Sequence, residues 1–325
     1  MGCNMLELVN LSNDRTDTEG LLGGNSAQLA SFLQRHHLDG IEFMCCAPWD
    51  KSFHQPDIIK GFHLWFWPSW LDFWLENEQA LLREFGSWEK VESCFGASRE
   101  AWLDRWAANF QQAADCGAEY AVFHVAQARS SEIRCRSFAY SSAQVIEAVL
   151  DIINQLTARL PSEMALLYEN LWWPGLDLTL PALVHELLAG TKHKCGIMLD
   201  TGHLMNTNTR LCCESQAADY ILRIVDSLGS AAGSIQGVHL HTSFSGEYVE
   251  KERQRHNQPE YNLPAGEIMD YVLKVDRHQP FRTAAARRIV DAVQPRYLVH
   301  EFVPENYEDW ENKLVQQQKV LYRRL

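Results

Sequence analysis

Four short apolar segments, each ending on an acid or a histidine, most strongly constrain what this chain can fold into. Each reads as a buried strand, and helix-like sequence separates one from the next. Side chains alternate along a strand, so Met198 and Asp200 share one face, and Gly202 lets the chain turn sharply before His203. In a (β/α)8 barrel, functional groups gather at the C-terminal ends of the strands. The segments are residues 165–170, 196–203, 237–241 and 297–302.

The rest of the chain continues this alternation, which predicts an α/β fold with a single (β/α)8 TIM barrel over residues 1–325. No linker rich in proline, glycine or serine divides the chain. The long gaps after strands three and seven predict insertions, and residues 10–25 and 242–263 read as polar loops. The predicted strands are residues 5–9, 40–44, 61–66, 120–125, 165–169, 196–200, 237–241 and 297–301, and the predicted helices are residues 26–37, 98–116, 142–160, 179–188, 216–228, 281–293 and 306–325.

Composition narrows the partners and the compartment. The net charge of −13 argues against nucleic acid as a partner, because no basic field exists to hold a phosphate backbone. Nine cysteines without a CxxC pair predict reduced thiols in a cytoplasmic protein. We find no signal peptide and no run of about 18 apolar residues that would cross a membrane. A small-molecule substrate is therefore the expected partner, and the sequence also admits a homo-oligomer.

The strand ends supply three carboxylates and one imidazole: Glu169, Asp200, His239 and Glu301. One such residue is usually structural, but four at matching positions in consecutive units are hard to explain separately. This ligand set suits a hard or borderline divalent ion such as Mn²⁺, Mg²⁺ or Co²⁺, and Zn²⁺ also fits. The sequence therefore predicts a divalent metal site at the mouth of the barrel.

Other residues near the mouth are candidates for substrate binding. Glu42 lies in the middle of strand two and points into the mouth or forms a structural hydrogen bond. His241 shares the inward face of strand seven and would contact the substrate or support the metal ligands. Trp65 and Trp67 belong to an aromatic segment that forms either a small core under a loop or an apolar wall for a sugar. Trp172, in the loop after strand five, is a further candidate.

These motifs together resemble the xylose isomerase-like barrel superfamily, which holds sugar isomerases, ketose 3-epimerases and endonuclease IV. The motifs are Leu-Asp-Gly-Ile-Glu at 38–42, Tyr-Glu-Asn at 168–170, Leu-Asp-Thr-Gly-His at 199–203, Val-His-Leu-His at 238–241 and His-Glu-Phe at 300–302.

The ketose epimerase branch of this superfamily implies one metal ion bound by Glu169, Asp200, His239 and Glu301. It also implies that Glu169 and Glu301 are the catalytic acid/base pair and that His203 binds a substrate oxygen. A base removes the proton α to a carbonyl while the metal stabilises the enediolate. By this resemblance the protein is expected to be a metal-dependent isomerase or epimerase of a sugar or polyol.

Endonuclease IV, which cleaves abasic DNA, gives the second hypothesis. That enzyme uses three zinc ions, with extra histidines on strands three and four that match His63 and His124 here. It also uses an Asp-x-His pair after strand seven, and residues 261–266 contain none. Only His256 and Glu260 lie near enough to substitute, so we expect an incomplete third metal site. A third hypothesis is a non-catalytic barrel, or an enzyme of another small molecule such as a cyclitol. Under the isomerase or epimerase hypothesis, His63 and His124 are expected to contact the substrate.

Overall fold

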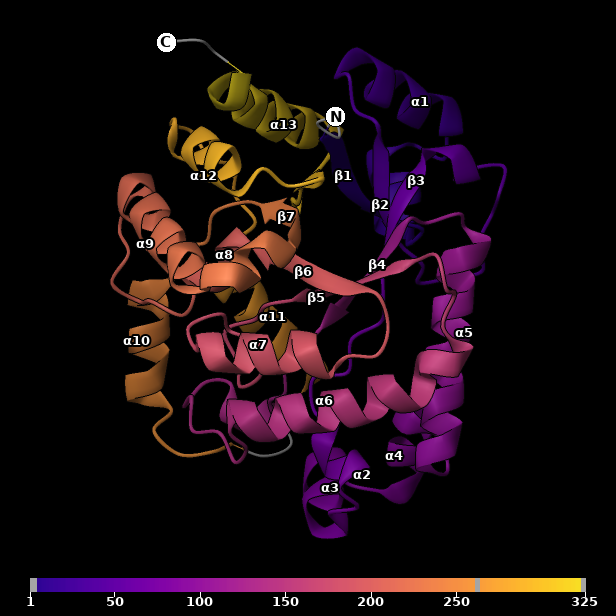
Figure 1. Ribbon diagram of the computed structural model, residues 1–325, viewed down its shortest axis with the longest axis vertical. Coiled ribbons are helices and arrows are strands. Elements are labelled where there is room, and N and C mark those ends of the chain that lie inside the picture. The colour runs from indigo at the N-terminus through magenta and orange to yellow at the C-terminus, as the bar shows by residue number, and fades with distance from the viewer. Residues whose placement is uncertain (1–4, 261–263, 323–325) are drawn as a thin grey trace.

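The computed structural model, which describes residues 5–260 and 264–322, shows a closed barrel of eight parallel strands (Figure 1). The strands pair in sequence order, and β8 closes the ring against β1 with Leu8 opposite Val299. The predicted eight-stranded barrel is confirmed. The strands are β1 (Leu6–Ser12), β2 (Gly40–Met44), β3 (Ile59–His63), β4 (Tyr120–His124), β5 (Ala165–Glu169), β6 (Cys195–Asp200), β7 (Ile235–Leu240) and β8 (Tyr297–His300).

Apolar and aromatic side chains fill the inside of the barrel. Tyr120, Leu167, Met198 and Val299 belong to one buried cluster contributed by alternate residues of several strands. Gly61 makes room for Tyr120, because a Cβ at that position would lie 2.2 Å from the tyrosine Cζ. The interior is thus a solid core, and polar functional groups are confined to the mouth at the strand ends.

Helices surround the strands and cover their outward-facing side chains (Figure 1). Ser98 and Ser141 cap two of them by accepting hydrogen bonds from backbone N–H groups three residues later. No helix in the described residues is both long enough and apolar enough to cross a membrane. The main covering helices are α1 (Ser26–Arg35), α5 (Arg99–Asp115), α6 (Ser142–Leu156), α7 (Pro181–Gly190), α9 (Glu214–Ser227), α12 (Ala285–Val293) and α13 (Tyr307–Tyr322).

The insertion after β3 carries three short helices, α2 (Leu71–Trp74), α3 (Glu78–Phe85) and α4 (Trp88–Phe95). Its aromatic side chains form a core against α5: the rings of Trp70 and Trp74 lie 5.8 and 6.0 Å from that of Trp102. An ion pair between Arg129 and buried Asp72, at 2.7 Å, ties the insertion to the loop after β4. One half of the tryptophan-rich segment is therefore structural, and only its beginning reaches the mouth.

The prediction that residues 242–263 form a polar loop was wrong. They contain helix α10 (Gly246–Arg255), and helix α11 (Ala265–Val275), also unpredicted, follows the undescribed residues 261–263. Helix α10 has six charged residues out of ten, and Val249 is its one buried side chain. Pairs such as Glu250–Arg253 support it, so its sequence lacks the apolar periodicity of a covering helix. Residues 10–25 likewise contain a short π-helix, η1 (Thr16–Leu21), where a loop was expected.

The buried His54 gives a test of the packing next to β2. Its ring lies 4.8 and 4.7 Å from the rings of Phe43 and Phe53, and neither ring nitrogen has a hydrogen-bond partner. Burial lowers the pKa of His54 to about 4. The folded protein therefore binds a proton on His54 less readily than the unfolded chain, in which the pKa is 6.5. As the pH falls from 6.5 toward 4, protonation favours the unfolded chain, and the free energy of unfolding decreases.

We therefore expect His54→Leu to make stability less dependent on pH. At pH 5 the unpaired imidazole should cost wild type about 2 kcal/mol that the leucine variant does not lose. Urea unfolding of both proteins, each treated with a chelator, measures the free energy of unfolding at about pH 7.5 and pH 5. The effects of the other titrating groups are the same in both proteins, so they cancel when the two pH-dependent losses are subtracted. An equal loss of unfolding free energy in both proteins would contradict the assignment.

Candidate metal centre

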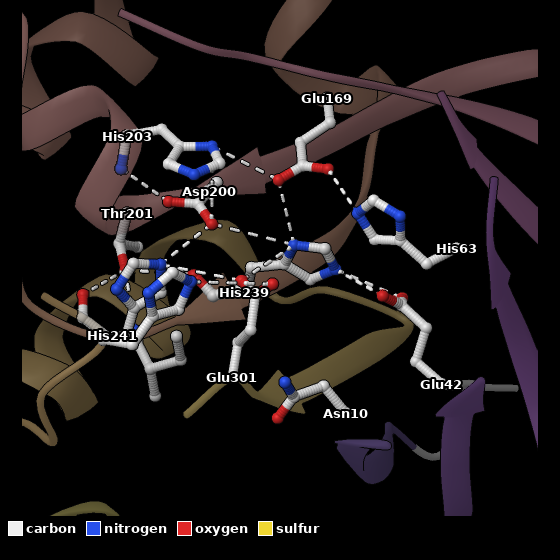
Figure 2. A network of polar contacts seen from close by, with 12 residues as sticks. Asn10, Glu42, His63, Glu169, Asp200, Thr201, His203, His239, His241 and Glu301 are labelled. Carbon is white, nitrogen blue, oxygen red and sulfur yellow. Dashed lines mark hydrogen bonds and ion pairs between the residues drawn. The ribbon is translucent and has the colours of Figure 1, made fainter. Parts of the chain in front are cut away.

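Acidic and imidazole side chains from six consecutive strand ends converge at the mouth of the barrel. Figure 2 shows five of them: His63, Glu169, Asp200, His239 and Glu301. Five of the six sit in or at the ends of β3 to β7, and the last follows β8 directly. Since parallel strands of a closed barrel end on the same rim, residues far apart in the sequence meet within hydrogen-bond distance. These residues are His63, His124, Glu169, Asp200, His239 and Glu301.

The turn after β6 shows why the Asp-Thr-Gly-His sequence is required. Asp200 caps the short helix α8 (Thr201–Met205), and its Oδ1 accepts a 2.6 Å hydrogen bond from the backbone N–H of His203. Asn170 bridges to the backbone of Asp200 through both atoms of its side-chain amide, at 2.9 and 3.0 Å. A Cβ on Gly202 would lie 2.1 Å from the ring of His241. Only glycine therefore lets the turn approach that imidazole.

The first donor group joins β3, β4 and β5. Glu169 Oε2 lies 3.3 Å from His63 Nε2 and 3.2 Å from His124 Nε2. Tetrahedral Zn²⁺ with bonds of about 2.0–2.1 Å holds neighbouring donors about 3.3 Å apart. No hydrogen bond reaches Glu169 Oε2 although the residue is fully buried. The three donor atoms have the spacing and the unmet bonding capacity of a metal site.

The second donor group contains the four predicted ligands. His239 Nδ1 lies 3.2 Å from both Glu169 Oε1 and Glu301 Oε2 and 3.7 Å from Asp200 Oδ2. On the other side of the ring, His239 Nε2 lies 2.9 Å from Glu42 Oε1. That carboxylate orients the imidazole so that Nδ1 faces the three acids, which is how carboxylates commonly support metal-bound histidines.

The third donor group includes Asp276 and His278, which the sequence analysis missed. Asp276 Oδ2 lies 3.0 Å from His203 Nε2 and 3.3 Å from His278 Nε2. His241 completes the surroundings: its ring stacks on His278 at 4.4 Å and its Nε2 lies 2.9 Å from Asp200 Oδ2. The expectation that no Asp-x-His pair follows strand seven was therefore wrong, because Asp276-Arg277-His278 is such a pair and lies at the mouth.

Charge balance supports the same interpretation. Burial alone would raise the pKa of Glu169, but its interactions with the neighbouring imidazoles, His124 and His239 first among them, outweigh burial and hold the pKa well below its usual range. Burial likewise opposes a charged imidazole, yet Asp200 and Asp276 raise the pKa of His203 well above its usual value. Buried ionised carboxylates lose their hydration, so nearby positive charge is needed to offset that cost. The residues fit divalent cations, which would replace protons in that role.

The other predicted candidates lie around these groups. Glu42 sits behind His239 and accepts a 2.7 Å hydrogen bond from Tyr120. His241 is fully buried beneath the acids. His256 and Glu260, considered as substitutes for the Asp-x-His pair, contact each other at 2.8 Å and are in none of the donor groups found among the described residues.

The predicted substrate-binding tryptophans line a cavity next to the donor groups. Trp65, Trp67 and Trp172 form part of its wall. Its acidic and histidine lining residues, here called the floor, are His63, His124, His203, Asp276, His278 and Glu301. A smaller cavity on the other side contains Asn10, Ser12, Asp17 and Glu42, and both cavities share His63 and Glu301.

Comparisons with known proteins agree with this architecture. A sequence search finds no match among curated proteins. Endonuclease IV from Thermus thermophilus is 16% identical over 97% of this chain and 98% of its own, with a TM-score of 0.51. D-psicose 3-epimerase is 12% identical over 98% and 99%, with a TM-score of 0.54. The 3-keto-D-glucoside 4-epimerase from E. coli is 12% identical over 97% and 100%, with a TM-score of 0.52.

At these identities the likeness to solved structures shows the fold. The sequence model of a protein family gives the stronger statement, because it matches residues 59–283, which is more than half of the chain. This protein therefore belongs to the xylose isomerase-like TIM barrel family.

Proposed function

We propose that this protein is a hydrolase of a phosphate ester that uses two or three divalent metal ions. The observation that carries the proposal is the set of four overlapping donor groups at the mouth, in which Glu169, Asp200 and His241 are each shared between two groups. Enzymes that hydrolyse phosphate esters commonly hold two metal ions about 3.5–4 Å apart. With Asp276 and His278 included, the donor set matches every part of the endonuclease IV pattern described above, His63 and His124 among them.

The position of Glu169 favours hydrolysis over isomerisation. Its Oε2 faces His63 and His124, and its Oε1 faces His203 and His239, with all four distances between 3.2 and 3.3 Å. The side chain is fully buried. A base that removes a proton from a sugar carbon needs an oxygen directed at the substrate, and both oxygens of Glu169 face histidines instead.

Glu301 is better placed to handle a proton. Its side chain is 12% exposed and lines both cavities. Its Oε2 belongs to the second donor group, whereas its Oε1 lies 3.9 Å from His278 Nε2 and is the oxygen left for a proton. Divalent ions bound here would supply Lewis acidity for the phosphoryl oxygens and lower the pKa of water. Glu301 can accept the proton of the attacking water, while Glu42 holds the ring of His239 and Asn170 holds the backbone at Asp200.

A small substrate fits this site better than DNA. Two arginines of the loop after β4 are paired with acids, Arg129 with Asp72 and Arg134 with Glu260, and the chain carries a net charge of −13. Arg136 and Arg277 donate to the backbone carbonyls of Asn206 and Phe244. A DNA backbone would require a basic surface. We therefore propose a small-molecule phosphate ester as substrate and keep nucleic acid as the disfavoured alternative.

A sugar isomerase or epimerase remains the second candidate. The group Glu169, Asp200, His239 and Glu301 alone is the ligand set that resemblance to ketose epimerases implies. Under that hypothesis His63, His124, Asp276 and His278 would contact the substrate or each other, and one ion would suffice.

Counting bound metal separates the two candidates. We expect purified protein reconstituted with Zn²⁺ and dialysed to hold two or three ions per chain by inductively coupled plasma mass spectrometry. The double variant Asp276→Asn/His278→Ala should lose one ion, because it removes donors of the third group. His256→Ala/Glu260→Gln, which changes a similar pair outside the groups, should lose none. One ion in wild type and in both variants would refute the multinuclear site.

Activity gives an independent test. We expect the reconstituted protein to hydrolyse 4-nitrophenyl phosphate or its bis ester, and Glu301→Gln to lower kcat about 10²- to 10³-fold because it removes the proton acceptor. The control Glu260→Gln should keep wild-type kcat. If neither ester is cleaved while solvent deuterium enters a ketose substrate, the isomerase candidate replaces the hydrolase.

A further inference from the structure

The larger cavity at the mouth is apolar on every side except its floor. It has a volume of about 840 Å³, within the range of about 300–1,000 Å³ typical of small-molecule sites. Aromatic residues from the loops after β3 and β5 form one wall, and helix α11 forms the other. The apolar lining residues are Trp65, Phe66, Trp67, Pro68, Leu171, Trp172, Trp173, Ile268, Met269 and Val272.

The apolar wall begins directly at the donor groups. The ring of Phe66 lies 4.7 Å from that of His124, and the ring of Trp172 lies 5.1 Å from that of His203. If one atom of a substrate is held at the donor groups, the next group of that substrate therefore already lies in the aromatic cavity. No polar segment separates the donor groups from the apolar wall.

Charge divides the site into two parts. Among the described residues that line the cavity, none is a lysine or an arginine, and the charged groups are confined to the floor. An anionic group in the upper cavity would lose its hydration without gaining a partner. The negative charge of a substrate must therefore lie at the metal ions, and the rest of it must be uncharged.

The smaller cavity is mixed in character and much smaller. Its volume is about 230 Å³, and its lining combines Asn10, Ser12 and Asp17 with apolar residues such as Leu11 and Phe302. A long or bulky apolar end therefore has more room, and a more uniformly apolar lining, in the larger cavity under α11.

We propose that the substrate is a phosphate ester of a bulky apolar alcohol, aromatic or long-chain, whose uncharged body fills the tryptophan-walled cavity. The phosphate part of this statement rests on the proposed function, whereas the apolar part rests on the cavity alone. In the reaction, the oxygen of water bonds to phosphorus and the bond from phosphorus to the ester oxygen breaks. One proton of that water passes to the departing alcohol, so the products are the free alcohol and inorganic phosphate.

Two exposed residues of helix α11 provide a matched pair of variants. Met269 is 57% exposed and lines the cavity, whereas Leu273, one turn later and 45% exposed, does not. Met269→Glu places a carboxylate in the apolar wall, and Leu273→Glu places one on the same helix outside it. Both are surface changes, so thermal unfolding and metal content should match wild type.

The probes separate the apolar body from the phosphate. We expect 1-naphthol to bind metal-free wild-type protein in isothermal titration calorimetry, and Met269→Glu to weaken this binding by about tenfold or more. Leu273→Glu should bind it as wild type does. With metal present, kcat/KM for 1-naphthyl phosphate should exceed that for glycerol 2-phosphate by about tenfold or more, and Met269→Glu should remove the preference.

The possible results are distinct. Naphthol binding that depends on Met269, with neither ester cleaved, supports the apolar ligand and refutes the phosphate hydrolase. Cleavage of both esters at equal kcat/KM, or no naphthol binding, or naphthol binding equally sensitive to both variants, overturns the apolar ligand and leaves the hydrolase to its own tests.

Discussion

A carboxylate buried between imidazoles is the interaction on which the mouth of this barrel depends. Glu169 is fully buried, ends strand β5, and lies within 3.3 Å of nitrogens from His63, His124, His203 and His239. Those histidines come from β3, β4, α8 and β7. Contacts with the single carboxylate of Glu169 therefore hold these four segments close to one another. Such a cluster is costly to bury without positive charge, which protons supply in part and divalent ions would supply fully.

The barrel places this cluster by filling everything beneath it. Tyr120 occupies the interior opposite Gly61 and also donates its hydroxyl to Glu42, which in turn orients His239. Packing of the core and orientation of a candidate ligand are therefore connected through one chain of contacts. Above the cluster, the loops after β3 and β5 and helix α11 add an apolar enclosure. The charged part of a substrate would therefore lie at the floor, and its apolar part would lie against the aromatic and aliphatic side chains above the floor.

Sequence reasoning recovered the barrel because its strands are short, apolar and regularly separated by helical patterns. It also grouped Glu169, Asp200, His239 and Glu301, because the C-terminal ends of all strands in a closed parallel barrel lie on the same rim. It missed Asp276 and His278 because the segment before them was treated as a loop. Helix α10 is held by charged pairs and carries little apolar signal, so the region that brings the Asp-x-His pair to the mouth could not be placed. The signal itself, an Asp-x-His triplet, was present further along the chain.

The tryptophans show a second limit of the sequence. A small core under a loop and the wall of a pocket both require aromatic residues, so composition does not distinguish them. Both occur here within one short segment: Trp70 and Trp74 pack on Trp102, and Trp65 lines the cavity. Trp67 does both, because it lines the cavity and its ring lies 4.8 Å from that of Trp106.

Anomalous X-ray diffraction at the zinc absorption edge, from crystals of the reconstituted protein, would locate each bound metal ion. We expect one peak on each side of the Glu169 carboxylate, the first against His63 and His124 and the second against Asp200, His239 and Glu301. A third peak at Asp276 would complete the set. A single peak at the second position, with His63 and His124 hydrogen-bonded to Glu169 instead, would contradict this expectation.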